Sequence, residues 1–377
     1  MKTCGIVAEY NPFHNGHRYH LQQAKIKSEA DLMIVVMSGN FVQRGEPAIL
    51  DKWKRASCAV QNGADIVIEL PYLYSTQAAS QFAHGAVSLL KTAGVDFISF
   101  GSECGNLENL QEIAETSINP DHLHEALDHG MSYPKAYSLL TSEMLPNDIL
   151  ALCYLKEIQG SSIQPVLIQR TSDYLSDELS TDASAMAIRE ALFAQKDILN
   201  TTPMKEDLEH SYLPRWDAYY PYLRTFLLTS SKEQLEQFFL FQEGIENHLK
   251  KNAQWSSTWN EFLSSSVTYR YTAGRIRRTC LQAMVQLTKQ EVRKLPPLDT
   301  LRILAFNENG RKWLHEKRKE DIRIASKFSD IPYPWRSLEY RSTLLYASIF
   351  PEEERNEILQ KEIQGAMYIR NEKSIRQ

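Results

Sequence analysis

Two histidines spaced three residues apart, His14 and His17, are the first side chains whose type and spacing suggest chemistry. They lie in the stretch EYNPFHNGHRYHL, between an apolar run, GIVAEY, and a helix-like pattern, RYHLQQAKIKSEA. Side chains at this spacing are neighbours on the first turn of a helix. Two adjacent imidazoles that donate hydrogen bonds can hold phosphate oxygens and stabilise the charge that develops on them in a transition state.

The residues around the two histidines suit the same chemistry. Gly16 allows the backbone to approach a bulky anion, Pro12 limits the geometry of the loop, and Asn11 offers a further donor. The N–H groups at a helix N-terminus attract phosphate. Taken singly, each histidine is typical of a surface or capping residue, whereas the set HNGH after a buried strand favours a phosphate site. The P-loop pattern and the GxGxxG pattern do not occur in the sequence.

Short apolar runs alternate with amphipathic stretches through the first half of the chain. The runs predict strands at 4–10, 32–38, 65–71, 95–103 and 165–170, and the stretches predict helices at 16–29, 50–64 and 77–93. Continuous β-branched runs between helices indicate a parallel sheet covered on both faces. With right-handed crossovers, this is a doubly wound α/β domain. Ligands bind such a sheet at the carboxyl ends of its strands, which is where the stretch with the histidines begins.

Helical patterns dominate the second half of the chain. They cover 204–217, 231–249, 273–290 and 297–318. We therefore predict two domains: a doubly wound catalytic domain over residues 1–200 and a mainly α-helical domain over 201–377. The polar stretch at 200–203 marks the expected boundary.

Composition narrows the class of protein. The chain has 377 residues, 43% of them apolar and 24% charged. Its net charge is −5, so the overall charge does not favour binding to a polyanion such as a nucleic acid. Its five cysteines are scattered and form no CxxC pair, which indicates reduced thiols and neither a disulfide frame nor a zinc site. The sequence shows no signal-peptide pattern and no apolar segment of membrane-spanning length, so we expect a cytoplasmic protein with no membrane partner.

The HNGH segment matches the HxGH element of the nucleotidyltransferase superfamily, and further stretches carry a closer resemblance. These are MSGNFVQRGEPAILDKWKRA (37–56), ADIVIELP (64–71), FGSE (100–103), PNDIL (146–150), ASAMAIREAL (183–192), RYTAGRIRR (270–278) and LRILAFNENGRKWL (301–314). Together they resemble the bacterial tRNA(Met) cytidine acetate ligase family over almost the whole chain. The resemblance implies a HUP-like nucleotidyltransferase fold. It also implies an enzyme that adenylates acetate with ATP and transfers acetyl to N4 of the wobble cytidine of elongator tRNA(Met), giving N4-acetylcytidine.

The resemblance also assigns residues. It implies catalytic roles for His14 and His17, and ATP contacts for Val7, Ala8, Glu9, Tyr10, Asn11, Pro12, Phe13, His14, Asn15, Gly16, His17, Arg18, Tyr19, His20, Gly101, Asn147, Arg170, Ser184 and Arg189. Three of these have a structural alternative. Asn147 also fits the cap of a helix over 147–158, Arg170 a surface charge at a strand end, and Ser184 the N-cap of an amphipathic helix. Mg²⁺ is expected to shield the triphosphate, and no protein residue is assigned to a metal.

A polar loop follows the second predicted strand and contains Asn40, Gln43, Arg44 and Glu46. Because it lies at the carboxyl edge of the sheet, we expect it to close over the acyl group or to help hold tRNA. The alternative is an ordinary long connection with Asp51 as a helix N-cap.

A basic segment, 270–294, stands out from an acidic chain. Its arginines predict a positive ridge for tRNA phosphates, formed by Arg270, Arg275, Arg277 and Arg278. Tyr269 and Tyr271 are candidates for stacking on loop bases, and basic residues at 312–319 for extending the surface. A solvated helix face is the alternative. Two other functions stay open: a small-molecule nucleotidyltransferase that transfers AMP or CMP to a phosphorylated cofactor precursor, and a non-catalytic RNA-binding protein.

Overall fold

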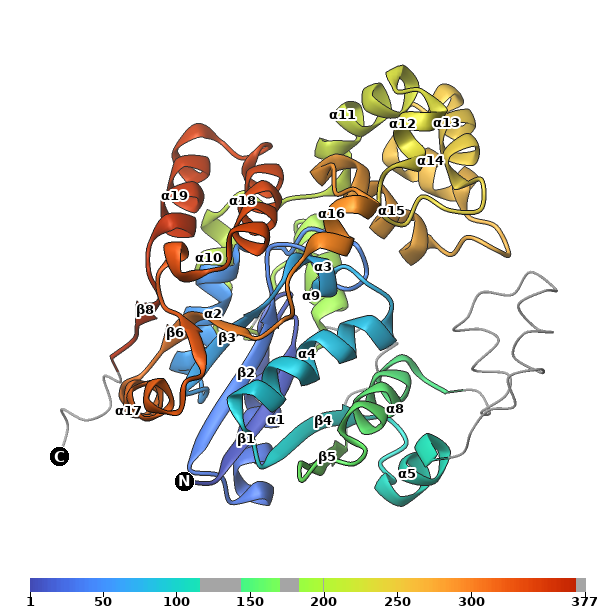
Figure 1. Cartoon of the computed structure of the whole chain (residues 1–377). Helices are drawn as coiled ribbons and strands as arrows, with labels where there is room; N and C mark the ends of the chain where they lie inside the picture. Colours follow the sequence, from blue (N-terminus) through green and yellow to red (C-terminus); the bar gives the residue numbers. More distant parts are fainter. Residues whose placement is uncertain (116–143, 170–182, 199, 371–377) are drawn as a thin grey trace.

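The computed structural model describes residues 1–115, 144–169, 183–198 and 200–370 (Figure 1). A central sheet has the strand order β5-β4-β1-β2-β3-β6-β7, with β8 paired to β6. Its five parallel strands are β1 (Thr3–Ala8), β2 (Leu32–Ser38), β3 (Ile66–Leu70), β4 (Phe97–Ser102) and β5 (Gln164–Gln169). Three strands from the second half follow: β6 (Thr300–Phe306), β7 (Arg323–Ala325) and β8 (Met367–Tyr368).

Helices cover both faces of the sheet, which confirms the doubly wound α/β fold. Along β2, Leu32 and Ile34 pack into a core with α4 (Ala79–Ala93) and α8 (Pro146–Ile158), while Met33 and Val35 pack on the opposite face. Figure 1 shows α4 and α8 lying across one face. The opposite core is formed with α1 (Asn15–Ser28), α2 (Lys52–Gln61) and α9 (Ala185–Phe193). Both faces are buried because alternate residues of an all-apolar strand point to opposite sides.

Most remaining helices share a third core above the carboxyl ends of the parallel strands. Figure 1 shows α11 to α16 as a lobe on one side and α18 and α19 on the other. Phe41 and Tyr72 from the first half of the chain belong to this core, so the two halves are packed together. The helices not yet given are α3 (Tyr72–Ser75), α5 (Leu107–Glu115), α10 (Lys205–His210), α11 (Trp216–Thr229), α12 (Lys232–Glu236), α13 (Ile245–Trp255), α14 (Trp259–Ser266), α15 (Ala273–Val285), α16 (Lys289–Lys294), α17 (Glu308–Lys317), α18 (Tyr333–Ala347) and α19 (Glu352–Ile363). Of these, α5 and α17 belong to the core with α4 and α8, and α10 belongs to the opposite core. None of the helices in the described ranges is both long and apolar enough for a membrane span.

The helix predicted over 297–318 is wrong in its first part. Residues 300–306 form β6, which runs antiparallel to β3 with Ile66 opposite Phe306. Leu301 and Leu304 lie on opposite faces of the sheet, as a strand requires. The spacing of the apolar residues there also fits a helix, and the pairing partner lies more than two hundred residues away. The second half of the chain thus adds strands to the sheet of the first half. The division into two domains at residue 200 stays a prediction.

A buried cluster of ion pairs joins the C-terminal segment to the sheet. Lys52 Nζ lies 2.6 Å from Glu69 Oε1 and 2.7 Å from Glu362 Oε2. Arg302 contacts the same two carboxylates, at 2.6 Å and 2.8 Å. The four side chains come from α2, β3, β6 and α19, and all are buried. Charges are stable in such a place only when each is paired, so the cluster makes these four elements depend on one another.

The buried carboxyl group of Glu339, beside this cluster, should make the stability of the protein depend on pH. Its carboxyl group accepts the Tyr72 N–H at 2.8 Å. Burial, reinforced by the charge of Glu69, raises the pKa of Glu339 from 4.5 to about 8. The folded protein therefore binds this proton more tightly than the unfolded chain does. The stability it contributes is complete below the unfolded pKa and is lost as the pH rises through the folded value.

We expect the thermal unfolding midpoint to fall between about pH 5 and about pH 8, and Glu339→Gln to flatten this fall. The matched control is Glu353→Gln, on the exposed side of α19, which should keep the wild-type pH profile. Midpoints measured across that range for the three proteins check the prediction. Equal slopes for the wild type and Glu339→Gln would contradict it.

Candidate active site

The HNGH segment lies at the point where the strand order of the sheet reverses. From β1 the chain continues to β2 and β3 on one side, and β4 and β5 pair on the other. The carboxyl ends of β1 and β4 therefore border the crevice in which sheets of this kind bind ligands. The chain leaves β1 after Ala8 at this edge of the sheet, and α1 begins at Asn15.

The two histidines form a reciprocal cap at the start of α1. His14 is the N-cap, and its Nδ1 accepts the Gly16 N–H at 3.1 Å. Nδ1 of His17 accepts the His14 N–H at 3.2 Å, and the ring centroids are 3.7 Å apart. Because each Nδ1 is an acceptor, the proton of each neutral ring resides on Nε2. The positive end of α1 thus carries two adjacent N–H donors, which is an arrangement suited to phosphate oxygens.

Contacts within the loop and from residues 201–202 hold this cap in place. The ring of His17 packs against Tyr10 and Phe13, with centroids 4.8 Å and 5.7 Å away. Thr202 Oγ1 donates to the Phe13 carbonyl at 2.5 Å, and the Asn15 N–H donates to the Thr201 carbonyl at 3.0 Å. The stretch predicted as a domain boundary is thus fastened to the loop. The polar sequence of residues 200–203 is typical of a linker, and no local pattern in it indicates this contact.

Gly16 leaves no room for a larger residue beside the His14 ring. A Cβ at this position would lie 2.8 Å from His14 Cε1 and 3.0 Å from Nδ1. Gly16→Ala should therefore displace the ring and lower the rate of ATP-dependent chemistry by about 100-fold, with little loss of stability. Steady-state rates and thermal midpoints measure both effects. The control is Gly274→Ala, where the nearest atom is the movable end of Arg278 at 3.2 Å, and we expect a near wild-type rate there.

Across the crevice, residues of β4 and α8 are joined by hydrogen bonds. Asn147 Nδ2 donates to the Glu103 carboxylate, and Asp148 Oδ1 accepts Ser102 Oγ at 2.5 Å. The N-cap of α8 is Leu145, so the interpretation of Asn147 as a cap is wrong. Gly101 is the penultimate residue of β4, paired with β5.

A bond from α1 reaches the same region, because His20 Nε2 lies 3.0 Å from Ser99 Oγ in β4. His20 of α1 thus contacts the strand that carries Gly101, and Asn147 of α8 contacts Glu103, the residue after that strand. Arg170 lies outside the described residues.

Helix α9 contacts the other side of the HNGH loop. Ser184 caps it, accepting the Ala187 N–H at 3.1 Å. Arg189 Nη1 donates to the Asn11 carbonyl at 2.6 Å, and its Nη2 lies 3.7 Å from Glu46. Arg189 is thus brought to the first loop from far along the chain, and Ser184 fixes the start of the helix that carries it.

The side chain of Asn11 holds the 39–51 loop, because its Oδ1 accepts the Ile49 N–H at 2.7 Å. Glu9 accepts the Gln43 N–H at 2.8 Å, and burial raises the pKa of its carboxyl. The other residues of 7–20 that are predicted to contact ATP differ in exposure. Val7 and Ala8, at the end of β1, are half-buried, Pro12 is buried, and Arg18 and Tyr19 are exposed on α1.

Arg55 is a structural part of the site that the sequence motifs do not reveal. It is fully buried and donates to the carbonyls of Glu9 at 2.6 Å and Ser38 at 3.1 Å. It also donates to the Leu50 carbonyl at 2.9 Å. One guanidinium thus fixes the ends of β1 and β2. The local signal is an arginine, three residues after Lys52, on the buried face of α2.

The four arginines of the predicted ridge contact two different parts of the molecule. Arg270 and Arg275 contact Glu243, at 3.4 Å and 2.8 Å. Arg277 Nη1 lies 3.3 Å from Glu46, and Arg278 Nη1 donates to the Gln43 carbonyl at 3.2 Å. The first pair faces the helical lobe and the second faces the 39–51 loop, so the four do not form a single solvated face.

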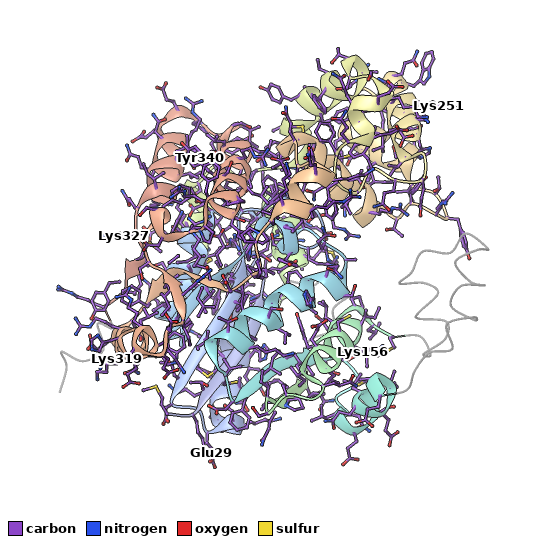
Figure 2. The ribbon with its side chains drawn as sticks, viewed as in Figure 1. Glu29, Lys156, Lys251, Lys319, Lys327 and Tyr340 are labelled. Carbon is purple, nitrogen blue, oxygen red and sulfur yellow. The ribbon has the colours of Figure 1, made fainter. Side chains whose placement is uncertain are left out.

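The other predicted RNA contacts are also rearranged. Tyr271 is buried, with its hydroxyl donating to the Glu243 carbonyl at 2.8 Å, so it cannot stack on a base, whereas Tyr269 is half exposed. Figure 2 shows Lys319 near one corner of the molecule and Lys251 on the helical lobe at the opposite corner. The basic residues at 312–319 therefore do not continue the segment 270–278.

Within the described ranges, no group of three His, Cys, Asp or Glu side chains is arranged so that it could hold a metal ion.

The fold and the capped HNGH segment at its switch point are those of a nucleotidyl transferase. A family model described as HIGH Nucleotidyl Transferase matches residues 1–362. Two solved structures of Thermotoga maritima TmcAL match 98% of this chain and 100% of theirs at 31% identity. The apo form has a TM-score of 0.89, and the form bound with alpha-thio ATP has 0.87.

The names of curated relatives specify the reaction more closely than the family model does. The tRNA(Met) cytidine acetate ligase of Limosilactobacillus reuteri is 40% identical, over 94% of this chain and 97% of that protein. Those of Geobacillus sp. (strain WCH70) and Bacillus subtilis are 38% and 35% identical, over 96% and 95% of this chain and 98% and 94% of their own lengths. The chain therefore belongs to the tRNA(Met) cytidine acetate ligase family of HIGH nucleotidyl transferases, which confirms the resemblance of its motifs.

Proposed function

We propose that this chain activates acetate with ATP and transfers the acetyl group to N4 of the wobble cytidine of elongator tRNA(Met), giving N4-acetylcytidine. The observation that carries the proposal is the reciprocal histidine cap at the positive end of α1, in which both rings accept at Nδ1 and therefore carry their protons on Nε2, at the switch point of the sheet. Relatives named for this reaction match nearly the whole chain, and a TmcAL structure at 31% identity is bound with alpha-thio ATP. The place of action is the cytoplasm.

The first step is adenylation. A carboxylate oxygen of acetate attacks the α-phosphorus of ATP, the bond to the bridging oxygen breaks, and pyrophosphate leaves with the electron pair. His14 and His17 donate from Nε2 to the phosphate oxygens on which negative charge grows, and the α1 terminus adds its dipole. Ser184 and Arg189, on the other side of the HNGH loop, hold the pyrophosphate as a second clamp. Gly101 and Asn147 border the base and ribose, and Arg170 completes the proposed ATP contacts.

The second step is acyl transfer. The N4 amine of cytidine attacks the carbonyl carbon of acetyl-adenylate, AMP leaves, and the nitrogen loses one proton. Neither step needs a covalent protein nucleophile, so the cysteines have no role in it. We propose that Mg²⁺ enters with the nucleotide, because the described side chains do not form a cage for it, and no step is assigned to it. Arg270, Arg275, Arg277 and Arg278 remain our candidates for phosphates of the tRNA, which would replace Glu243 and Glu46 as partners of the first three.

The experiment is mass spectrometry of the nucleosides of elongator tRNA(Met) after incubation with the protein, ATP and isotopically labelled acetate. The expected product is a cytidine that carries one labelled acetyl group, formed only with ATP present, with one AMP released per acetyl transferred. A matched tRNA with uridine at the wobble position is the control and should stay unmodified. Unlabelled cytidine in tRNA, together with transfer of AMP or CMP to a small phosphorylated molecule, would refute the proposal.

A further inference from the structure

A cleft lies where the two halves of the chain meet. It has a volume of about 320 Å³ and is bounded by the 44–49 segment, α9, α11, α14 and α15. This volume is at the lower end of the range for pockets that bind small organic ligands, about 300–1,000 Å³. It admits one unpaired nucleotide and not a duplex.

The walls of the cleft are held rigidly. Trp216 and Trp259 stack with centroids 4.2 Å apart and planes within 9° of parallel, and Trp216 Nε1 donates to the Gly45 carbonyl at 2.8 Å. Gly45 has a φ of +75°, and a Cβ there would lie 2.7 Å from the Arg278 nitrogen. The 39–51 loop is therefore pressed against α15 and joined to α11. A pocket with fixed walls loses little conformational entropy when it binds a ligand.

Two arginines give the cleft the chemistry of an RNA site. The guanidinium of Arg215 lies over the ring of Phe193 at 4.4 Å, while half of the side chain remains exposed. In that position its N–H groups can reach a phosphate, and its outer face can stack on a base. Arg277 Nη1 faces Glu46 at 3.3 Å, and its buried Nε has no hydrogen-bond partner among the described residues. Asp217 is the nearest opposing charge to Arg215, at 3.7 Å.

The cleft is also connected to the loop that carries the histidines. Arg189 lines the cleft and donates to the Asn11 carbonyl at 2.6 Å. Glu46, a second lining residue, lies between Arg189 and Arg277, at 3.7 Å and 3.3 Å. A ligand in the cleft therefore lies one side chain away from the start of the HNGH loop.

We infer that this cleft binds an unpaired nucleotide of the RNA substrate, with its phosphate on Arg215 and Arg277 and its base against the Arg215 guanidinium. The inference rests on the proposed function and adds the place where RNA is held. It also explains why Arg277 faces inward, because a phosphate that enters the cleft exchanges with Glu46 as its partner. An unpaired RNA residue is favoured over a free nucleotide because the cleft is open to solvent and lies between the α11–α16 lobe and the 44–49 segment with α9, so the strand can continue on both sides.

The test uses fluorescence anisotropy with an elongator tRNA(Met) transcript and the full-length protein at several KCl concentrations. Arg215→Gln should weaken binding about three- to tenfold and reduce the slope of log affinity against log salt by about 0.7 to 0.9. Asp217→Asn should strengthen binding, because it removes the competing charge. Arg311→Gln on α17, at the far end of the molecule from α11 and α14 in Figure 1, is the matched control and should bind like the wild type.

Two further measurements keep the result interpretable. Arg215→Lys keeps the charge and loses the stacking plane, so it should restore the salt slope without restoring the full affinity. Acetate-dependent exchange of pyrophosphate into ATP is measured without RNA in each variant. The inference is overturned by an Arg215→Gln protein that binds tRNA like the wild type, or by an equal loss in Arg311→Gln. If Arg215 controls tRNA binding but the wild type shows no acetate-dependent exchange, the cleft stands and the proposed reaction fails.

Discussion

Replacing His17 by alanine should lower acetate-dependent exchange of pyrophosphate into ATP by about two to three orders of magnitude. Two contributions are lost together in this variant. The Nε2 donor that faces the developing charge disappears, and Nδ1 no longer accepts the His14 N–H, so the neighbouring ring loses its support. Exchange reports the adenylation step alone, and therefore the measurement does not depend on tRNA.

His17→Gln separates the two contributions. Glutamine at the third position of a helix accepts the N-cap N–H in a capping box, so this variant should regain the thermal midpoint of the wild type. It lacks the imidazole donor, so exchange should remain close to that of His17→Ala. Recovery of activity in His17→Gln would mean that the ring acts only as a cap. Exchange at the wild-type rate in His17→Ala would contradict a catalytic role altogether.

The largest loss of stability is expected from Lys52→Met. The lysine is the partner of both Glu69 and Glu362 in the buried cluster, and its side chain is 1% exposed. Its removal leaves two carboxylates to share Arg302, and breaking one partner of a buried ion pair costs about 3–5 kcal/mol. We expect this loss in the free energy of unfolding measured by urea titration.

Two further variants test the cause of that loss. Arg323→Ala removes an exposed pair with Asp299, at 2.9 Å, and should cost no more than about 1 kcal/mol. The double variant Lys52→Met/Glu69→Gln leaves one cation and one carboxylate paired, so it should be more stable than the sum of its single variants. An effect of Lys52→Met as small as that of Arg323→Ala would show that the cluster is not a tie between the two halves.

The parallel half of the sheet and the position of the histidines could be predicted because both depend on local patterns. Apolar runs such as LMIVVMS at 32–38 have one interpretation as buried strands, and HNGH follows the first of these runs directly. The cap itself is harder to predict, since either ring nitrogen of a histidine can donate or accept a hydrogen bond. Only the geometry shows that both rings accept at Nδ1.

What escaped prediction depends on contacts between distant segments. The strand at 300–306 needs β3 as its partner, and the contact of residues 201–202 with the HNGH loop needs the complete fold. The arginines of 270–278 read as a surface because they are close in sequence. Glu243 and Glu46, which neutralise them, lie elsewhere in the chain. Charge counted along a sequence does not reveal which charges are paired.

If the capped start of α1 holds the triphosphate of ATP, a crystal structure of this protein with alpha-thio ATP will show it. We expect phosphate oxygens within hydrogen-bonding distance of Nε2 of both His14 and His17, with the base beside Gly101. A nucleotide bound in the cleft beneath Arg215, or anywhere else away from that helix terminus, would contradict it.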